Sequence, residues 1–582
     1  MKKAFGFCLK YWRSIIFVFA LLLIQAWCDL ALPEYMSKIL AEGVAGQNSA
    51  LVWRYGGIML GYAFGVCTAS VTVGYLSARI GAGVSRDIRA ELFSRTADFS
   101  GAEFDRFGVS TLITRATNDV TQIQMFLIML IRIALYSPIA AAGGIFKALK
   151  TGGGAGGSAW IIAVGVGALL TFIAVLLLTV QPKFLRLQKL TDKINLLARE
   201  RLNGMTVIRA FGTGAYERGR FGEANTALTD TSLFVNRVMS LLFPVINLIM
   251  YGIMAAVIWL TAKSAVSAQS VADMTAFIQY AATVIMSFLM LTMIFVLFPR
   301  AVVSAKRVGE VLSTERSVKD SPGAADIDTV TDGVEFRDVT FSYPNSEAPV
   351  LSGVSFRAEL GQTTAIIGST GSGKSTLVSL IPRLYDPGGG EVLFSGRSVK
   401  DITLRSLRKN VAFVPQKATL FSGTVKSNIL FGGDGNDGGG EDARMLEAAE
   451  ISQSAEFIGE KSGGFDEPID RGGANVSGGQ KQRLAVARAL AKNAPVIVFD
   501  DSFSALDFKT DSALRAALRE RCKSAAVIAV AQRVGTIMSA DKIIVLDGGR
   551  LAGEGTHGEL MKTCAVYADI AKSQLSEEEL NK

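Results

Sequence analysis

Long apolar stretches dominate roughly the first 300 residues of the chain, and polar, basic stretches separate them. A helix needs about 20 apolar residues to cross the ~30 Å hydrocarbon layer of a membrane. The pattern therefore predicts six membrane-spanning helices, at residues 15–40, 52–80, 123–147, 159–181, 238–262 and 274–298.

The connections between these helices alternate between short and long. The two long ones, residues 81–122 and 182–237, are basic and have helical spacing, with one break in each at 104–111 and 212–216. Basic residues keep loops in the cytoplasm, so the N-terminus and both long connections are predicted to lie there. We expect a short helix at each break to bear on a soluble domain.

Charged side chains inside the apolar stretches are costly unless they face protein or water. Asp29 lies in the first predicted span and Arg132 in the third. Two interpretations stay open. The charged residues form a buried structural pair or snorkel to the membrane interface, or they are a polar spot that lines a translocation cavity.

Alternating strand patterns begin at residue 334 and repeat at 350–360, after a linker at 313–333 that is rich in Ser, Asp, Gly and Pro. A short apolar run, 364–367, then leads into a glycine-rich segment that fits G-x-x-x-x-G-K-[ST] between a strand and a helix. Backbone N–H groups of such a loop close around phosphates, the lysine reaches the β- and γ-phosphates and the hydroxyl after it holds Mg²⁺. The predicted phosphate-binding residues are Gly368, Ser369, Thr370, Gly371, Ser372, Gly373, Lys374, Ser375 and Thr376.

A second nucleotide motif ends the apolar run 496–499. Its last residue, Asp500, fits a carboxylate that positions Mg²⁺ beside a phosphate-binding loop. The two motifs together predict an α/β P-loop domain at 334–582 that binds ATP with Mg²⁺, after a membrane domain of six helices at 1–312 with long cytoplasmic extensions.

Composition agrees with a membrane protein. Hydrophobic residues make up 49% of the chain and charged residues 19%, below the ~25% of soluble domains. Residues 1–330 carry 31 Lys and Arg against 20 Asp and Glu, while residues 331–582 carry 29 against 32. The basic excess thus lies in the apolar half, and no nucleic-acid partner is predicted. The five cysteines form no CxxC motif and are predicted to be unpaired thiols.

The segment between the two nucleotide motifs carries a resemblance. Residues 477–480 read SGGQ, about a hundred residues after the P-loop, which resembles the signature of ATP-binding cassette (ABC) transporters. Six spans before one cassette are similar to an exporter-type half-transporter, in which two chains make one machine. The resemblance covers almost the whole chain.

The resemblance implies roles for further residues. Tyr343 matches the aromatic residue that stacks on adenine, and Gln416 the glutamine that touches Mg²⁺ and the attacking water. Asp507 matches the D-loop. In the family, the signature reaches across a dimer interface to the γ-phosphate held by the other chain. The resemblance implies this role for Ser477, Gly478, Gly479 and Gln480.

Two positions depart from the family pattern. Asp501 stands where the family has the glutamate that polarises the attacking water, and Gln532 where it has a switch histidine. An aspartate carboxylate is withdrawn by about an ångström, and such a misplacement can cost ~10²-fold in rate. Glutamine cannot become a cation, as histidine can. With the signature intact, this combination is similar to the degenerate subunit of bacterial heterodimeric multidrug exporters.

The predicted function is therefore that of an exporter subunit for amphipathic or hydrophobic molecules, with weak ATPase activity on its own. The expected partner is a second, non-identical half-transporter with intact glutamate and histidine. The expected location is the bacterial plasma membrane, with the ATP-binding domain in the cytoplasm. Alternatives are a homodimeric lipid or drug exporter that tolerates Asp501, and a nucleotide-gated regulatory or importing assembly on the same fold.

Overall fold

The computed structural model describes residues 6–152, 159–263, 267–344, 346, 348–433, 440–504, 506–521 and 523–576. The chain divides into two compact units, and each is described by itself. One unit comprises Met1–Thr96 and Ser110–Thr314, and the other comprises Ala97–Val109 and Glu315–Lys582.

The first unit is helical. Within the described residues, six helical segments are long and apolar enough to span a membrane: Phe7–Val44, Ser49–Ala97, Val109–Thr151, Trp160–Asn203, Gly214–Lys263 and Ala268–Ser313. Their longest regular helices are α2 (Trp12–Lys38), α3 (Ser49–Ala97), α7 (Tyr136–Gly152), α8 (Ala159–Asn203), α10 (Gly214–Ser240), α11 (Leu242–Lys263) and α12 (Ala268–Ser313). At 1.5 Å per residue, the 49 residues of α3 extend well beyond the hydrocarbon layer. The predicted membrane domain of six helices with long extensions is confirmed.

The third span is not one regular helix. It consists of α5 (Val109–Thr114), a π-helical turn at Arg115–Asp119, α6 (Val120–Met129), a second π-helical turn at Leu130–Ala134, and α7. The periodic apolar pattern did not indicate these turns, because a π-turn adds one residue without changing the composition.

Charged residues of the spans have specific partners. Tyr136 donates a hydrogen bond of 2.8 Å to Asp29. Lys147 forms an ion pair with Glu34, which accounts for a lysine at the end of the span where the basic-loop rule does not expect one. Arg132 is exposed in this unit, and the partner of Asp29 is Tyr136 rather than Arg132. The structural-pair interpretation therefore does not hold for Asp29 with Arg132.

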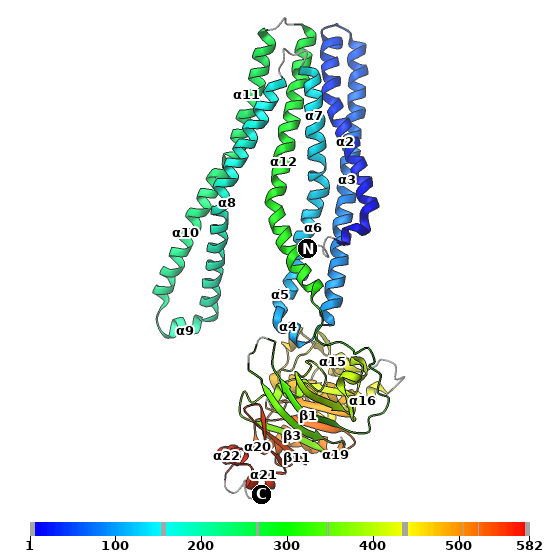
Figure 1. Ribbon diagram of the computed structural model, residues 1–582, viewed down its shortest axis with the longest axis vertical. Coiled ribbons are helices and arrows are strands. Elements are labelled where there is room, and N and C mark those ends of the chain that lie inside the picture. Colours follow the sequence, from blue (N-terminus) through cyan, green and yellow to red (C-terminus); the bar gives the residue numbers. More distant parts are fainter. Residues whose placement is uncertain are drawn as a thin grey trace. The chain divides into compact units, whose positions relative to one another are not determined.

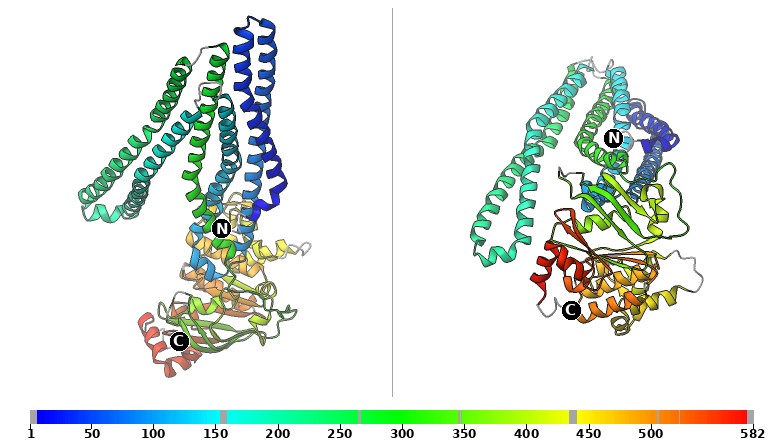
Figure 2. Two further views of the ribbon diagram at one scale, coloured as in Figure 1. Left: turned by 45° about the horizontal axis from the view of Figure 1, so that its top comes forward. Right: turned by 60° about the horizontal axis from the view of Figure 1, so that its bottom comes forward.

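Helices α8 and α10 run side by side as an arm, joined by the short helix α9 (Met205–Ala210) (Figure 1). Figure 2 shows the same arm from two further sides. Large apolar side chains at its tip are exposed, among them Val207, Phe211 and Tyr216. The predicted break at 212–216 coincides with the end of α9 and the start of α10.

The second unit is an α/β domain. A six-stranded sheet has the order β12-β11-β3-β10-β9-β6, a four-stranded sheet the order β2-β1-β4-β5, and β7 pairs with β8. The strands are β1 (Val334–Phe341), β2 (Leu351–Ala358), β3 (Thr363–Gly368), β4 (Gly389–Phe394), β5 (Arg397–Ser398), β6 (Val411–Val414), β7 (Gly423–Thr424), β8 (Pro468–Ile469), β9 (Val496–Asp500), β10 (Ala526–Val530), β11 (Lys542–Asp547) and β12 (Arg550–Gly555). The helices are α13 (Lys374–Ser379), α14 (Leu404–Lys409), α15 (Val425–Ile429), α16 (Glu441–Ile451), α17 (Ala455–Gly459), α18 (Gly478–Ala491), α19 (Phe508–Arg521), α20 (Val534–Ile537), α21 (His557–Thr563) and α22 (Ala565–Gln574).

The two sheets differ in how their strands are buried. Every residue of β9 and β10 is buried, as expected for central parallel strands covered on both faces. In β1 the burial alternates, and Phe336 stacks on its cross-strand neighbour Phe356 with ring centroids 4.6 Å apart. Such a pair adds about 0.5–1.5 kcal/mol beyond its buried area.

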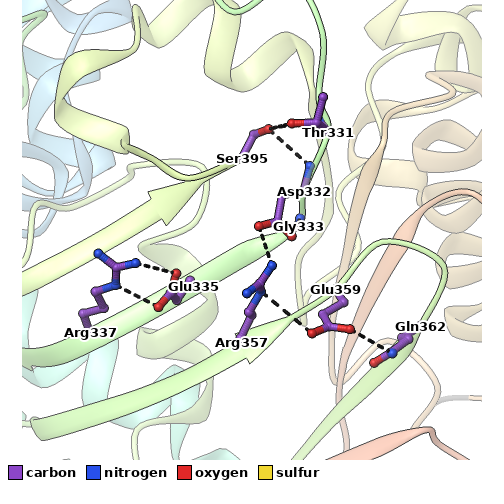
Figure 3. A network of polar contacts seen from close by, with 9 residues as sticks. All are labelled: Thr331, Asp332, Gly333, Glu335, Arg337, Arg357, Glu359, Gln362 and Ser395. Carbon is purple, nitrogen blue, oxygen red and sulfur yellow. Dashed lines mark hydrogen bonds and ion pairs between the residues drawn. The ribbon is translucent and has the colours of Figure 1, made fainter.

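A network of polar contacts lies at the start of β1 in the four-stranded sheet (Figure 3). Arg357 on β2 pairs with Asp332 at 2.7 Å, just before β1. Ser395 accepts a hydrogen bond from the backbone N–H of Thr331 at 2.9 Å. These groups are partly exposed to solvent, so the network contributes little to folding stability.

The second unit also contains one helix from the membrane half of the sequence. Helix α4 (Gly101–Phe107) lies at the predicted break of the first long connection and belongs to this unit. A capping box begins it, because Ser100 and Glu103 hydrogen-bond each other's backbone. Glu103 also accepts a 2.8 Å bond from the backbone N–H of Ser317. The expectation that a short helix here bears on a soluble domain is correct.

Candidate functional site

The parallel strands bring three nucleotide motifs to one edge of the six-stranded sheet. Strand β10 lies between β3 and β9, with Val530 opposite Ile366 on one side and Asp500 on the other. The carboxyl ends of the three strands therefore lie together, which is where α/β sheets bind their ligands.

The loop between β3 and α13 has the backbone of a phosphate cradle. Gly371 and Gly373 have φ angles of +86° and +92°, which favour glycine. A side chain on Gly373 would also meet the backbone oxygen of Val350 at 3.0 Å. Because α13 begins directly after this glycine, its free N–H groups face the loop.

Lys374 is held by the loop itself. Its ammonium group donates hydrogen bonds to the carbonyl oxygens of Gly368, at 2.9 Å, and Ser369, at 2.7 Å. Burial lowers the pKa of Lys374, and the charges of Asp501 and Asp500 oppose this effect. A buried ammonium group with neutral carbonyl partners fits the triphosphate of a nucleotide, which would supply strong acceptors.

Asp500 and Ser375 form the second part of the site. The Ser375 hydroxyl donates to Asp500 Oδ1 at 2.8 Å. Burial raises the pKa of Asp500, the neighbouring charge of Asp501 raises it further, and Ser375 and Lys374 lower it. A buried carboxylate next to a hydroxyl and a second carboxylate presents the hard oxygen donors that Mg²⁺ takes.

Asp501 is the centre of the third part. Its Oδ2 atom accepts hydrogen bonds from Gln532 Nε2 at 2.7 Å and from Gln416 Nε2 at 3.3 Å. Its backbone has a φ of +49°, and its N–H donates to the Val530 carbonyl at 3.1 Å. The two departures from the family pattern, at positions 501 and 532, are thus in direct contact.

A cleft of about 340 Å³ opens over these groups. It is lined by Val350, Thr370, Gly371, Gly373, Lys374, Ser375, Thr376, Gln416, Asp501, Val530 and Gln532. Most of these residues were predicted from the motifs, and the cleft brings them together.

Tyr343 lies beside this cleft. Its hydroxyl is 3.0 Å from the Thr376 Oγ1 atom on α13. Its ring contacts Phe341 and Tyr385 edge to face. The residue predicted to stack on adenine is therefore fixed to the same helix that carries the lysine.

The signature residues lie elsewhere. Ser477 caps α18, with its Oγ accepting from the backbone N–H of Gln480 at 3.3 Å and the Gln480 side chain accepting from the backbone N–H of Ser477 at 3.0 Å. Ser477 and Gly478 are exposed, and among the described residues this segment does not line the cleft. A helix N-terminus presented to solvent is a ready anion site for another molecule.

Asp507 has a local partner. Its carboxylate accepts from the backbone N–H and the hydroxyl of Thr510, at 3.0 and 2.8 Å, and these bonds lower its pKa. In this structure Asp507 therefore caps α19. Its neighbour Ala505 in the predicted D-loop lies outside the described residues.

The sequence did not single out Tyr385 or Gln574. Tyr385 packs against Tyr343, and Gln574 Nε2 donates to the Gln532 carbonyl at 2.9 Å. Tyr385 follows α13 by a few residues, so proximity to the P-loop helix was the one available signal. Gln574 lies far along the chain in α22, and no feature of the sequence connected it with the nucleotide site.

Three features together define a membrane-bound P-loop ATPase: a glycine-rich loop with its lysine, a carboxylate at the end of β9 in the same sheet, and six apolar spans. Residues 351–504 match the ABC transporter family, and residues 15–288 match the ABC transporter transmembrane region. The chain therefore belongs to the ABC transporter family.

Proteins of similar sequence align with most of this chain. An uncharacterized ABC transporter ATP-binding protein of Mycobacterium tuberculosis (strain CDC 1551 / Oshkosh) is 39% identical over 97% of this chain and 96% of that protein. An ATP-dependent lipid A-core flippase of Pseudomonas fluorescens (strain Pf0-1) is 34% identical over 85% of this chain and 81% of that protein.

A solved structure of a bacterial Atm1-family ABC exporter with ATP bound is 26% identical. The two structures superpose with a TM-score of 0.79, and the match covers 97% of this chain and 99% of the exporter chain. The predicted family and fold class are confirmed, and the chain is an exporter-type ABC half-transporter with an ATP-binding domain.

Proposed function

We propose that the chain is one subunit of a heterodimeric, ATP-driven exporter whose own nucleotide site hydrolyses ATP poorly. The observation that carries this proposal is the contact of Asp501 with Gln532 and Gln416. Both partners are neutral amides, and neither takes up a proton. Asp501 stands at the position of the water-activating base, and its side chain is one methylene shorter than the family's glutamate.

The remaining residues of the site favour binding over turnover. Lys374 and the loop N–H groups hold the phosphates, Tyr343 stacks on the base, and Ser375 and Asp500 hold Mg²⁺ with Gln416 beside them. ATP with Mg²⁺ supplies the γ-phosphoryl group whose transfer to water provides free energy for transport. With a retracted carboxylate and no imidazole, the chain keeps nucleotide bound for long periods.

A second, non-identical half-transporter completes the assembly in this proposal. The exposed helix N-terminus at Ser477 supports it, because such a terminus fits a phosphate held by another chain. The exposed apolar tip of the α8–α10 arm supports it too, since Phe211 and Tyr216 are 78% and 70% exposed. The partner carries the glutamate and histidine that this chain lacks, and its site uses this chain's Ser477 to Gln480.

The membrane placement is part of the same proposal. Basic residues in the long connections put the N-terminus, α9 and the ATP-binding unit in the cytoplasm of a bacterium, with the spans in the plasma membrane. Because the spans are apolar with few charges, amphipathic or hydrophobic compounds are the proposed cargo.

A homodimeric exporter of lipids or drugs is the second candidate. The relatives that are named lipid A-core flippases favour it, at 34% identity over most of their length. In that case Asp501 would serve as an adequate base in two equal sites.

The ATPase activity of the purified chain separates the two candidates. We expect the chain alone in lipid nanodiscs to bind ATP and to hydrolyse it feebly, and a co-expressed second half-transporter to raise turnover strongly. Brisk hydrolysis by the chain alone would favour the homodimer and reject the heterodimer proposal.

A further inference from the structure

The side chain of Gln574 connects the last helix of the chain with the loop that carries Gln532. Gln574 is the last residue of α22, and its Nε2 atom donates to the Gln532 carbonyl oxygen at 2.9 Å. Its Oε1 atom accepts from the backbone N–H of Val534 at 2.8 Å. A glutamine side chain has an acceptor oxygen and a donor nitrogen, so both functions of this amide are used, one on each side of Arg533.

These two bonds hold the backbone beyond the end of β10. The strand ends at Val530, and the N–H of Ala531 still donates to the Ile366 carbonyl at 3.0 Å. Helix α20 begins at Val534, and within the described part of the chain its N-cap residue forms no side-chain capping bond. The first N–H groups of a helix need partners outside it, and the Gln574 amide supplies one.

Helix α22 gives this amide a fixed support. It lies beside α20 (Figure 1), and its Tyr567 is fully buried in an apolar cluster that also contains Ala531 and Val534. Leu575, directly after Gln574, packs against the same cluster. Packing therefore holds the helix in place, while Gln574 itself is exposed and reaches the loop through its two hydrogen bonds.

Gln532 depends on such a support because it is also exposed. An exposed glutamine side chain samples several rotamers, yet the Gln532 Nε2 atom lies 2.7 Å from Asp501 Oδ2. Both residues line the cleft together with Lys374 and Ser375, the groups proposed to hold phosphate and Mg²⁺. A primary amide has two N–H groups, so Gln532 can offer one to Asp501 and the other to an oxygen of the third phosphate.

We propose that Gln574 is a positioning residue that holds Gln532 at the γ-phosphate end of the cleft, so that the site retains nucleoside triphosphates more firmly than diphosphates. The inference rests on the proposed nucleotide-binding function of the cleft and deepens it by naming what sets this preference. With the Gln574 amide in place, the backbone from Gln532 to Val534 is fixed at both ends. Without it, Gln532 turns toward solvent, and a triphosphate loses a contact that a diphosphate does not make.

The affinities of the full chain for two nucleotides test the proposal. The chain in nanodiscs is titrated, with Mg²⁺ present, with either ADP or adenylyl imidodiphosphate, an ATP analogue whose P–N–P bridge resists hydrolysis. In Gln574→Ala we expect the Kd of the analogue to rise about tenfold, as for one lost hydrogen bond to a charged group, and the Kd of ADP to change less than about twofold. Gln574→Glu keeps the size and the acceptor but loses the donor, so it should give a similar loss and covers the case in which the alanine variant folds poorly.

A double-mutant cycle shows whether Gln574 acts through Gln532. Gln532→Ala should weaken the analogue by a similar factor, and adding Gln574→Ala to it should cost less than about twofold more, because residues that act through one contact are not additive. The matched control is Leu575→Ala, which weakens the packing of the same helix end and leaves both Gln574 bonds possible. It should lower the melting temperature and keep the ratio of the two affinities.

An unchanged ratio of the two affinities in both Gln574→Ala and Gln574→Glu would overturn the proposal. Additive losses in the cycle would overturn it as well, since Gln574 would then act independently of Gln532. Because neither nucleotide is hydrolysed, these results do not depend on how fast the site turns over. The ATPase rate of the same preparation with ATP reports separately on the heterodimer proposal, and a fast rate would reject that proposal while the affinity ratio still decides the role of Gln574.

Discussion

Replacing Asp501 with glutamate and Gln532 with histidine in the same chain should convert a weak ATPase site into a competent one. Asp501 now has both side-chain donors on Oδ2, at 2.7 and 3.3 Å, and both come from amides. Glutamate moves the carboxylate outward by about an ångström, and such a displacement corresponds to ~10²-fold in rate. That factor equals about 2.7 kcal/mol of barrier.

The substitution also has a structural cost. Position 501 has a φ of +49°, a region that aspartate tolerates better than glutamate. We expect a loss of folding stability of about 1 kcal/mol at this position. This cost is small beside the folding stability of a typical domain, about 5–15 kcal/mol, so the double variant should remain folded and hydrolyse faster.

The assay is steady-state phosphate release by the chain alone in nanodiscs, at saturating ATP and Mg²⁺. The double variant should exceed the original chain by about 10²-fold, and Asp501→Asn, which has the same size and no charge, should not exceed it. An original rate within a few-fold of the double variant would show that the retracted carboxylate is an adequate base. The reasoning about positions 501 and 532 would then be wrong.

Three further substitutions test the fold and the site. Lys374→Ala should remove the thermal stabilisation by ATP, which in the original chain is about 2.7 kcal/mol at 100 times Kd; an unchanged shift would contradict the role of the lysine. Phe336→Ala should destabilise the ATP-binding unit by about 3–5 kcal/mol, seen as a lower melting temperature, while a loss under ~1 kcal/mol would contradict its place in the core. His557 bonds Tyr567 through Nδ1 at 2.7 Å, and burial lowers its pKa, so the unfolded chain binds the proton more readily. Folding stability should therefore fall as pH drops below about 6.5, and His557→Asn should reduce this fall in melting experiments between pH 7.5 and 5.5.

Much of the nucleotide site was predictable because its signals are local. The residues from Gly368 to Thr376 form one continuous loop and helix start, and Asp500 ends a strand whose apolar run is visible in the sequence. Parallel strands bring such ends together, so their proximity follows from the fold class. The direct contact between Asp501 and Gln532 did not follow from either motif, because it depends on side-chain direction at the ends of two neighbouring strands.

The link between Gln574 and the loop of Gln532 was beyond sequence analysis for a different reason. The two residues are 42 positions apart, and Gln574 belongs to no motif with a spacing rule. Similarly, hydropathy located the six spans by their length, yet the π-helical turns at Arg115–Asp119 and Leu130–Ala134 have no signature in composition. Asp507 illustrates a third limit, since the resemblance implied a D-loop role but gave no indication of the hydrogen bonds that Asp507 accepts from Thr510.

The two carbonyl bonds of Lys374 have a consequence for how the site meets its ligand. The ammonium group donates to the carbonyl oxygens of Gly368 and Ser369, so the loop that carries the lysine also orients it. An arriving triphosphate exchanges one set of acceptors for another, and little chain entropy is lost on the way. Capture should accordingly be quick, and retention should depend on how strongly the incoming oxygens outcompete two peptide groups.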